Sequence, residues 1–395
     1  MKSNYRKIGD FIQLVDIRNK DLKVTKLLGL SISKQFIPSV ANIIGTNMAN
    51  YKIIKKNQFA CSTMQVRRDK KMPIALLQDF DEAIISQAYP VFEVIDETIL
   101  NPEYLMMWFS RSEFDRHACF LAVGGVRGSL EWEDFLDMPI PVPSIEKQHA
   151  IVKEYNTIVS RIKLNETLNQ KLEDTAQALY KHWFVDFEFP NADGKPYKSS
   201  GGEMIYNEEL DMEIPLGWEV NEFSDVAEIV AGGDKPRNFS EFKTKECHIP
   251  ILSNGVSEEG LYGFTNEAKI FKNSITISAR GTIGYTVLRN EPFVPIVRLL
   301  VLTPKNENNI SYIFKYIENF DFNSSGSVQK QLTKPDLSVL KILMPLSFIL
   351  DYFDSKFNSL KKEITKKKQE IDLLKRFESI ILAKMSKVET KTVVV

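Results

Sequence analysis

The chain has 395 residues, of which 43% are hydrophobic and 26% are charged, and its formal net charge is −1. This size allows two or three domains with cores of their own. The balanced charge excludes nucleic-acid binding through an overall positive charge, so only local basic patches could bind DNA. The three cysteines are scattered, which favours reduced thiols. Since the N-terminus has no apolar signal core and no stretch approaches the ~20 apolar residues of a membrane span, we expect a soluble protein of the cytoplasm without a membrane partner.

Residues 1–143 are predicted to form a first globular domain that is rich in strands. Short apolar runs such as 53–54 and 91–94 are separated by polar turns, a pattern typical of short β-strands. A short helix is expected to begin at Pro102, because proline suits the first turn of a helix. The prolines of residues 139–143 indicate an edge strand that leads into the next element.

Residues 144–190 are predicted to form a long central helix, because this stretch contains no glycine and no proline before Pro190. Its apolar residues recur at heptad spacing, and Asn165 and Asn169 interrupt the middle of this apolar stripe. A helix of about 40 residues is ~60 Å long. Such a helix cannot bury its own stripe, so the sequence predicts a partner helix.

The second half of the chain repeats this order. Residues 191–346 are predicted to contain a polar linker and a second strand-rich domain. Residues 347–387 are predicted to form a C-terminal long helix, and residues 388–395 a short tail. The apolar residues of this helix share one heptad frame, in which Lys367 occupies one position. This helix is therefore the expected partner of the central helix.

The two halves are predicted to be copies of one unit. Asp134 and Asp336 each lie nine residues before the proline that ends a domain, which gives a shift of 202 positions (336 − 134). Near the start of each half, Asp10 and Asp225 give a shift of 215 (225 − 10). The sequence thus predicts an α+β fold with two similar strand-rich domains and two long coiled-coil helices, arranged as a duplicated unit.

Basic clusters in both domains are the candidate DNA contacts, since cations displace the counterions of the phosphate backbone. In the first domain the cations are Lys52, Lys55, Lys56, Arg67, Arg68, Lys70 and Lys71. In the second domain they are Lys269, Lys272, Arg280, Arg289 and Arg298. Arg280 lies in a predicted loop after a strand, where a guanidinium could contact a guanine edge. Solvated surface, or a structural salt bridge for Arg280, would explain the same residues.

Two polar loops before the closing strands are further candidate contacts. They contain Arg127 in the first domain, and Gln329, Lys330 and Gln331 in the second. Glutamine can read adenine, whereas arginine and lysine can read guanine or bind phosphate. An ordinary exposed turn remains the alternative.

No catalytic or metal site is expected. The phosphate-binding loop with the pattern Gly-x-x-x-x-Gly-Lys-Ser/Thr does not occur. Residues 101–104 are similar to an amino-methyltransferase motif, but Glu103 stands in place of the second proline. Residues 267–269 could belong to a nuclease motif, but no paired upstream carboxylate supports it. The four histidines and three cysteines lack metal-ligand spacing.

The order of short motifs within this repeat resembles the DNA-specificity subunit of type I restriction-modification enzymes. The motifs of the second half are residues 214–220, 227–233, 249–255 and 277–284. In the first half, a Pro-x-Pro sequence leads into Glu146, Lys147 and Gln148. The resemblance covers nearly the whole chain, although the first half matches less clearly.

The resemblance implies two target-recognition domains, each of which reads one half of an interrupted, asymmetric DNA sequence. It also implies that the two long coiled-coil helices pack antiparallel and separate these domains, which gives the repeat a pseudo-twofold axis. It implies that two methyltransferase subunits and restriction subunits are partners, in addition to double-stranded DNA. S-adenosylmethionine, ATP and Mg²⁺ would then belong to those partners, and this chain would have no cofactor and no catalytic activity. The exposed parts of both long helices are expected to dock the methyltransferase.

Two other classes of function stay open. A free-standing DNA-binding regulator would bind its site tightly without a methyltransferase. A DNA-modifying enzyme complete in one chain would show turnover with S-adenosylmethionine and DNA. A purely structural coiled-coil protein does not explain two strand-rich domains of similar size.

Overall fold

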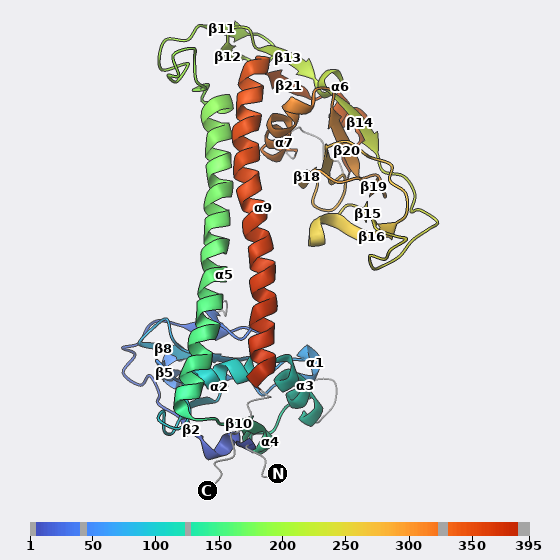
Figure 1. Cartoon of the computed structure of the whole chain (residues 1–395). Helices are drawn as coiled ribbons and strands as arrows, with labels where there is room; N and C mark the ends of the chain where they lie inside the picture. The colour runs from blue at the N-terminus through green and yellow to red at the C-terminus, as the bar shows by residue number, and fades with distance from the viewer. Residues whose placement is uncertain (1–4, 40–45, 123–127, 323–330, 386–395) are drawn as a thin grey trace. The chain divides into compact units, whose positions relative to one another are not determined.

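The computed structural model describes residues 5–39, 46–122, 128–322 and 331–385 (Figure 1). The chain packs as two compact units. The first unit contains residues Met1–Glu166 and Gln369–Val395, and the second contains Thr167–Lys368. Each unit therefore combines one strand-rich domain with parts of two long helices.

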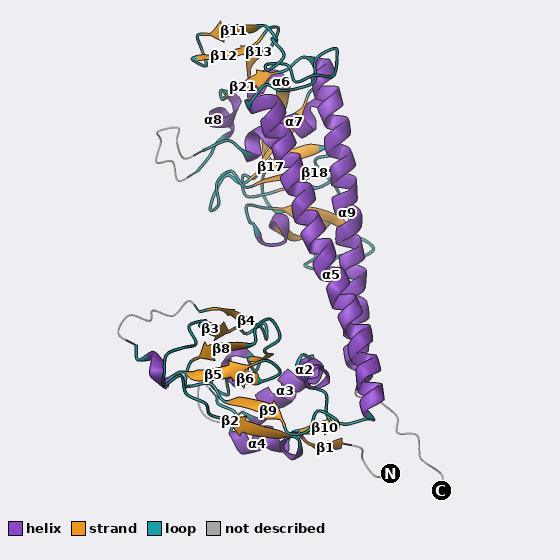
Figure 2. Ribbon diagram, turned by 90° about the vertical axis from the view of Figure 1, so that its left-hand side faces the viewer, coloured by secondary structure: helices purple, strands orange, loops and turns teal. Residues whose placement is uncertain are grey.

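The first unit is built on a four-stranded antiparallel sheet with the order β2-β9-β6-β7 (Figure 2). Its strands are β2 (Ile12–Val15), β9 (Val91–Val94), β6 (Phe59–Cys61) and β7 (Ile74–Leu76). The paired strands beside it are β1 (Tyr5–Lys7) with β10 (Pro139–Pro141), β3 (Leu28–Leu30) with β4 (Phe36–Pro38), and β5 (Lys52–Lys55) with β8 (Glu82–Ile85). The short helices are α1 (Val66–Asp69), α2 (Pro102–Phe109), α3 (Ser112–Leu121) and α4 (Trp132–Asp137).

The second unit has a sheet of the same kind, in the order β14-β20-β17-β18. Its strands are β14 (Ala227–Ala231), β20 (Leu300–Pro304), β17 (Ser274–Ile277) and β18 (Thr286–Arg289). The other strands are β11 (Met204–Asn207) with β12 (Met212–Pro215), β13 (Glu219–Glu222) with β21 (Lys341–Met344), and β16 (Leu261–Thr265) with β15 (Ile249–Leu252) and β19 (Val294–Pro295). The short helices are α6 (Phe223–Val226), α7 (Ile310–Glu318) and α8 (Lys334–Ser338).

Strand registers confirm the duplication. Arg6 lies opposite Ile140 in the first unit, and Asn221 lies opposite Ile342 in the second. The front strands are thus shifted by 215 positions (221 − 6) and the closing strands by 202 (342 − 140). These are the two shifts that the sequence predicts, so the insertions between the copies lie inside the domains.

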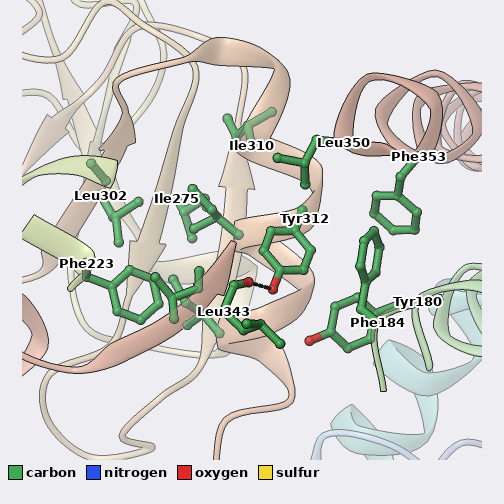
Figure 3. Close-up of a cluster of buried hydrophobic side chains, with 14 of the residues drawn as sticks. Tyr180, Phe184, Phe223, Ile275, Leu302, Ile310, Tyr312, Leu343, Leu350 and Phe353 are labelled. Atoms are coloured by element: carbon green, nitrogen blue, oxygen red, sulfur yellow. Dashed lines mark hydrogen bonds between the residues drawn. The ribbon is translucent and has the colours of Figure 1, made fainter. Parts of the chain in front are cut away.

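A tyrosine ties the closing strand to a helix in both copies. In the first unit the Tyr104 hydroxyl on α2 donates a hydrogen bond of 3.1 Å to the carbonyl oxygen of Pro141. In the second unit the Tyr312 hydroxyl on α7 donates to the carbonyl oxygen of Leu343 (Figure 3). Both tyrosines are fully buried. A buried hydroxyl needs such a partner, so each bond fixes the position from which a long helix begins.

The two predicted long helices are α5 (Ile145–Tyr180), which continues as a π-helix over Lys181–Val185, and α9 (Ser347–Lys384). In the first unit, Tyr155 of α5 donates to Glu378, and Arg161 donates to Glu370. Position rises along α5 as it falls along α9, so these segments run antiparallel. In the second unit, the pairs Glu173–Lys368 and Tyr180–Phe353 show the same direction. These contacts and the duplicated domains confirm the predicted fold class.

Gln148 anchors the first turns of α5 inside the first unit. Its side chain is fully buried. The amide nitrogen donates to the carbonyl oxygens of Ile99 (2.8 Å) and Pro143 (2.9 Å), while the amide oxygen accepts from the backbone nitrogen of Asn101 (2.8 Å). One side chain thus satisfies three backbone groups.

Asn165 and Asn169 are buried where they interrupt the apolar stripe of α5. Neither polar atom of the Asn165 side chain has a hydrogen-bond partner in the part of the chain that the structure describes, and the same holds for the Asn169 oxygen. Buried polar groups of this kind cost stability. In coiled coils such an asparagine selects one register over its competitors.

The second unit has an aromatic core that joins its domain to both long helices. Tyr180, Phe184 and Phe353 lie beside Tyr312 (Figure 3), and the Phe184 ring centroid is 4.6 Å from that of Tyr312. Trp183 is also buried in this cluster. This core holds the domain against the helices.

None of the helices in the described ranges is both long enough and apolar enough to cross a bilayer.

Candidate DNA-binding loops

The β6–β7 loop of the first unit carries most of the predicted cations. Its short helix α1 lies between two non-glycine residues with left-handed backbone, Gln65 (φ 66°) and Lys70 (φ 53°). Arg67 and Arg68 are exposed within the helix. The loop is anchored at its base, where the backbone nitrogen of Leu130 donates to the carbonyl oxygen of Thr63 (2.9 Å). The ends of β6 and β7 and this hydrogen bond therefore fix the base of the loop that carries the two guanidinium groups.

Within this loop, Arg68 and Arg67 have different surroundings. The Arg68 guanidinium lies 2.6 Å from the Asp69 carboxylate. This hydrogen bond raises the pKa of Arg68 and lowers the pKa of Asp69. Arg67 lies against Gly128, where a Cβ atom would come within 2.5 Å of the Arg67 Cβ. Only glycine permits this approach, so residue 128 supports the position of Arg67.

The β17–β18 loop is the equivalent loop of the second unit. It follows the strand that corresponds to β6, and the backbone nitrogen of Leu332 donates to the carbonyl oxygen of Ala279 (2.9 Å), just as Leu130 does to Thr63. Gly281 takes left-handed backbone with a φ of 70°. The exposed Arg280 lies at the start of this loop. The duplicated scaffold thus offers one basic loop at the same place in each unit.

Arg280 is oriented by a neutral side chain. Its Nε and Nη2 atoms donate to the Gln331 side-chain oxygen at 2.9 and 2.5 Å. These contacts are hydrogen bonds to a neutral amide, not the structural salt bridge that the sequence left open for Arg280. A guanidinium held through one edge keeps its other N–H groups for an external acceptor. Arg127, Gln329 and Lys330 lie outside the described residues.

Two of the predicted cations take part in the fold instead. The Lys52 ammonium donates to the carbonyl oxygen of Tyr89 (3.0 Å), its side chain is 13% exposed, and burial lowers its pKa. Arg289 pairs with Glu259 at 3.0 Å and donates to Thr276. Because Glu259 lies 30 positions away in the sequence, charge counting near Arg289 could not find this pair. We leave both cations out of the interface proposed below.

The remaining predicted cations are exposed at the ends of strands. Lys55 and Lys56 lie at the end of β5, and Lys272 lies before β17. Lys269 lines a cavity of about 360 Å³ together with Arg237 and polar side chains. Sequence reasoning missed Arg237, although it follows the motif that ends at Gly233 and is exposed on the same segment.

A second surface lies on the two long helices within the second unit. Phe348 and Tyr352 of α9 are 59% and 46% exposed. With Trp183 they line a cavity of about 480 Å³, which the segment from Pro190 to Gly194 closes on one side. Exposed aromatic side chains around a concavity are typical of protein docking sites. The docking role that the sequence suggests for the helices stays a prediction, and this cavity is a candidate place for it.

The described residues contain no group of three or more histidine, cysteine, aspartate or glutamate side chains that could hold a metal ion. The site consists of guanidinium and ammonium groups on loops, beside amides that orient them. Such groups bind phosphates and base edges. Because these groups are hydrogen-bond donors for such acceptors, the arrangement is suited to recognition.

A family model described as the type I restriction modification DNA specificity domain matches residues 2–174 and 215–380. The MjaIX specificity subunit of Methanocaldococcus jannaschii is 26% identical over 302 residues, which are 72% of this chain and 68% of that protein. The HindI specificity subunit of Haemophilus influenzae is 21% identical over 379 residues, with 78% of this chain and 81% of that protein covered.

A provisionally assigned type I specificity subunit of Mycoplasma pneumoniae is 28% identical over 225 residues. The match covers 56% of this chain and 54% of that protein, so the chain spans about half the length of this relative. Among solved structures, a type I restriction-modification S subunit from M. genitalium has a TM-score of 0.61 at 17% identity, with 98% of this chain and 96% of that chain covered. At this identity the likeness shows the fold.

Proposed function

The chain belongs to the type I restriction-modification DNA specificity family, and from this premise we propose that it reads an asymmetric, two-part DNA sequence and positions methyltransferase subunits on it. One observation carries the proposal. The β6–β7 and β17–β18 loops occupy the same place in a duplicated scaffold but present different cations. Two equivalent loops with unlike side chains suit two unlike half-sites.

Each unit contacts its half-site through one of these loops. Arg67, Arg68 and Lys70 serve the first unit, and Arg280 with Lys269 and Lys272 serves the second. Lys55 and Lys56, at the end of β5, add phosphate contacts in the first unit. Cations that neutralise phosphates give affinity, whereas a guanidinium that meets O6 and N7 of guanine gives sequence preference. Arg127, Gln329 and Lys330, which lie outside the described residues, stay candidate contacts by sequence.

The long helices set the distance between the two readers. Two readers on one face of DNA suit half-sites about one helical turn apart, ~34 Å, or slightly more. A helix of about 40 residues is long enough to supply this separation. The antiparallel packing of the helix segments within each unit supports the proposal. The DNA site then consists of two short blocks around an unread spacer.

The partners are two methyltransferase subunits and, where DNA is cleaved, restriction subunits. The cavity between Trp183, Phe348 and Tyr352 supports a docking role for the helices in the second unit. S-adenosylmethionine, ATP and Mg²⁺ belong to the partners, and this chain adds no catalytic group. The target adenine must leave the base stack to be methylated, a step that the methyltransferase performs. The complex works on DNA in the cytoplasm.

Co-expression with a type I methyltransferase subunit tests the proposal. We expect a stable complex that protects two separated blocks of one DNA strand pair from nuclease digestion. The chain alone, with S-adenosylmethionine and the same DNA, should transfer no methyl groups. The proposal fails if no complex forms, if protection covers one continuous block only, or if the chain methylates DNA by itself.

A further inference from the structure

The connection between β19 and β20 in the second unit has an unusual backbone. Val297 and Arg298 are consecutive and both have left-handed φ angles, 52° and 59°. Residues other than glycine rarely adopt this region, and for a β-branched side chain such as valine it is strained. Such strain persists only where the surrounding structure fixes it, and it is concentrated at functional sites.

Two glycines fix this turn through the backbone. The nitrogen of Val297 donates to the carbonyl oxygen of Gly233, and the nitrogen of Arg298 donates to that of Gly232, both at 2.9 Å. A Cβ atom at Gly232 would lie 2.8 Å from the backbone of Ile296. Any larger residue would push the segments apart. Gly232 and Gly233 thus hold the turn in place through these two hydrogen bonds.

Asn254 connects the turn to the Arg280 loop. Its side-chain nitrogen donates to the carbonyl oxygen of Val297, and its side-chain oxygen accepts from the backbone nitrogen of Ala279, both at 2.7 Å. The Asn254 amide thereby bonds one backbone group of the turn and one backbone group next to Arg280. Three sequence motifs, residues 227–233, 249–255 and 277–284, meet at this point. The two hydrogen bonds of Asn254 therefore connect the backbone beside Arg280 to the turn that carries Arg298.

The turn presents a guanidinium to solvent. Arg298 is exposed, and no ion pair of this side chain is found among the described residues. Lys269 also lies close to the Gly-Gly motif, with its ammonium 3.8 Å from where a Cβ of Gly233 would be. An exposed arginine on an immobilised backbone can meet the O6 and N7 acceptors of guanine with little loss of entropy.

The corresponding connection of the first unit lacks such a turn. Its connection between β8 and β9, residues 86–90, contains no non-glycine residue with positive φ. The carbonyl oxygen of Tyr89 in that connection is bound by the buried Lys52. The turn is therefore a feature of one half of the duplicated chain, which is expected of a residue that distinguishes one half-site from the other.

We propose that Arg298 reads a guanine in the half-site of the second unit and that Asn254 is the positioning residue for both Arg298 and Arg280. This inference rests on the proposed function. It adds a specificity-determining residue and the contact that orients it. Base reading differs from phosphate binding in its consequence, because loss of a base contact changes the sequence that is recognised, whereas loss of a phosphate contact weakens all sequences alike.

The test uses the full-length chain in complex with a type I methyltransferase subunit and a DNA library randomised in both half-sites. Wild type, Arg298→Ala, Asn254→Ala and the control Lys195→Ala, an exposed lysine of the linker, are compared by sequencing the methylated molecules. For Arg298→Ala we expect preference at one base position of one half-site to fall about tenfold or more, while the other half-site keeps its sequence. Asn254→Ala should relax that position and the one read by Arg280. Lys195→Ala should match wild type.

Asn254→Ala could unfold the second unit, so its thermal unfolding is measured beside the library. Arg298→Ala changes only an exposed side chain and decides the question alone. An unchanged sequence preference for Arg298→Ala, or an equal loss over all sequences, overturns base reading by Arg298. A wild-type complex that modifies no interrupted sequence overturns the proposed function, and this inference with it.

Discussion

The two units share their framework and differ in their loops. The strand registers, the sheet order and the tyrosine bond to the closing strand recur in both. The loop after the third strand of the sheet is a short helix with basic residues in the first unit, but a glycine-rich turn with Arg280 in the second. Duplication has thus kept the framework that positions these loops and changed the loops themselves.

The two units differ most strongly in how their long helices are packed. At the shift of 202, Ile151 of α5 corresponds to Phe353 of α9, but Ile151 is half-buried whereas Phe353 is fully buried among aromatic rings. Phe353→Ala should lower the free energy of unfolding of the second unit by about 3–5 kcal/mol. Ile151→Ala should cost the first unit about 1–2 kcal/mol. Urea unfolding with hydrogen exchange assigns each loss to its unit, and equal losses would contradict the difference in packing.

The start of each long helix offers a second contrast. In the first turn of α5, the buried side chain of Gln148 makes three hydrogen bonds to backbone groups. The corresponding position of α9 at the shift of 202 is the buried Leu350. Gln148→Leu leaves three backbone groups unpaired and should destabilise the first unit by about 2–4 kcal/mol. Gln170→Leu, at an exposed position of the same helix, is the control. Chemical denaturation measures both variants; a variant of Gln148 as stable as the control would show that these bonds are dispensable.

Recognition of DNA should divide between the two loops. Arg280→Ala should reduce base discrimination in one half-site about tenfold, and Arg67→Ala should act on the other half-site alone. Gln331→Ala should follow Arg280→Ala with a smaller effect, because it removes only the acceptor that orients the guanidinium. Binding of half-site variants by the methyltransferase complex measures these effects. Changes in both half-sites from one substitution would contradict the division.

The smallest expected effect concerns Asn165. Its buried amide has no partner in the described part of the chain, so Asn165→Leu should raise the free energy of unfolding by about 1 kcal/mol. The same substitution should weaken the preference for one helix register. Thermal unfolding measures the gain, with Gln170→Leu again as the control. A loss of stability would mean that the amide makes contacts that stabilise the helix pair.

Local signals made the framework predictable from sequence. The lack of proline and glycine and the heptad spacing predicted both long helices, and the prolines that end each domain gave the shift of 202 before any strand register was known. These signals lie within the elements that they describe. The motifs of the second half were also visible, but their meeting at Asn254 was not, because it depends on hydrogen bonds across 25 and 43 positions.

The candidate site was predictable only in outline. Sequence shows that Lys52, Arg280 and Arg289 are cations, but it does not show which of them the fold uses. Lys52 binds a carbonyl oxygen 37 positions away, Arg289 pairs across 30 positions, and Arg280 bonds a glutamine 51 positions away. Partners at such distances arise from the tertiary structure. Counting charges along the chain therefore overstated the number of free cations.

Mapping of methylated adenines tests the central claim most directly. Genomic DNA from cells that make this chain together with its methyltransferase is sequenced by a method that detects methylated adenine. We expect one interrupted sequence, with two blocks of different composition and a spacer of constant length, modified once in each block. A continuous recognition sequence, two identical blocks, or a spacer that varies in length would contradict the account of two unlike readers on one scaffold.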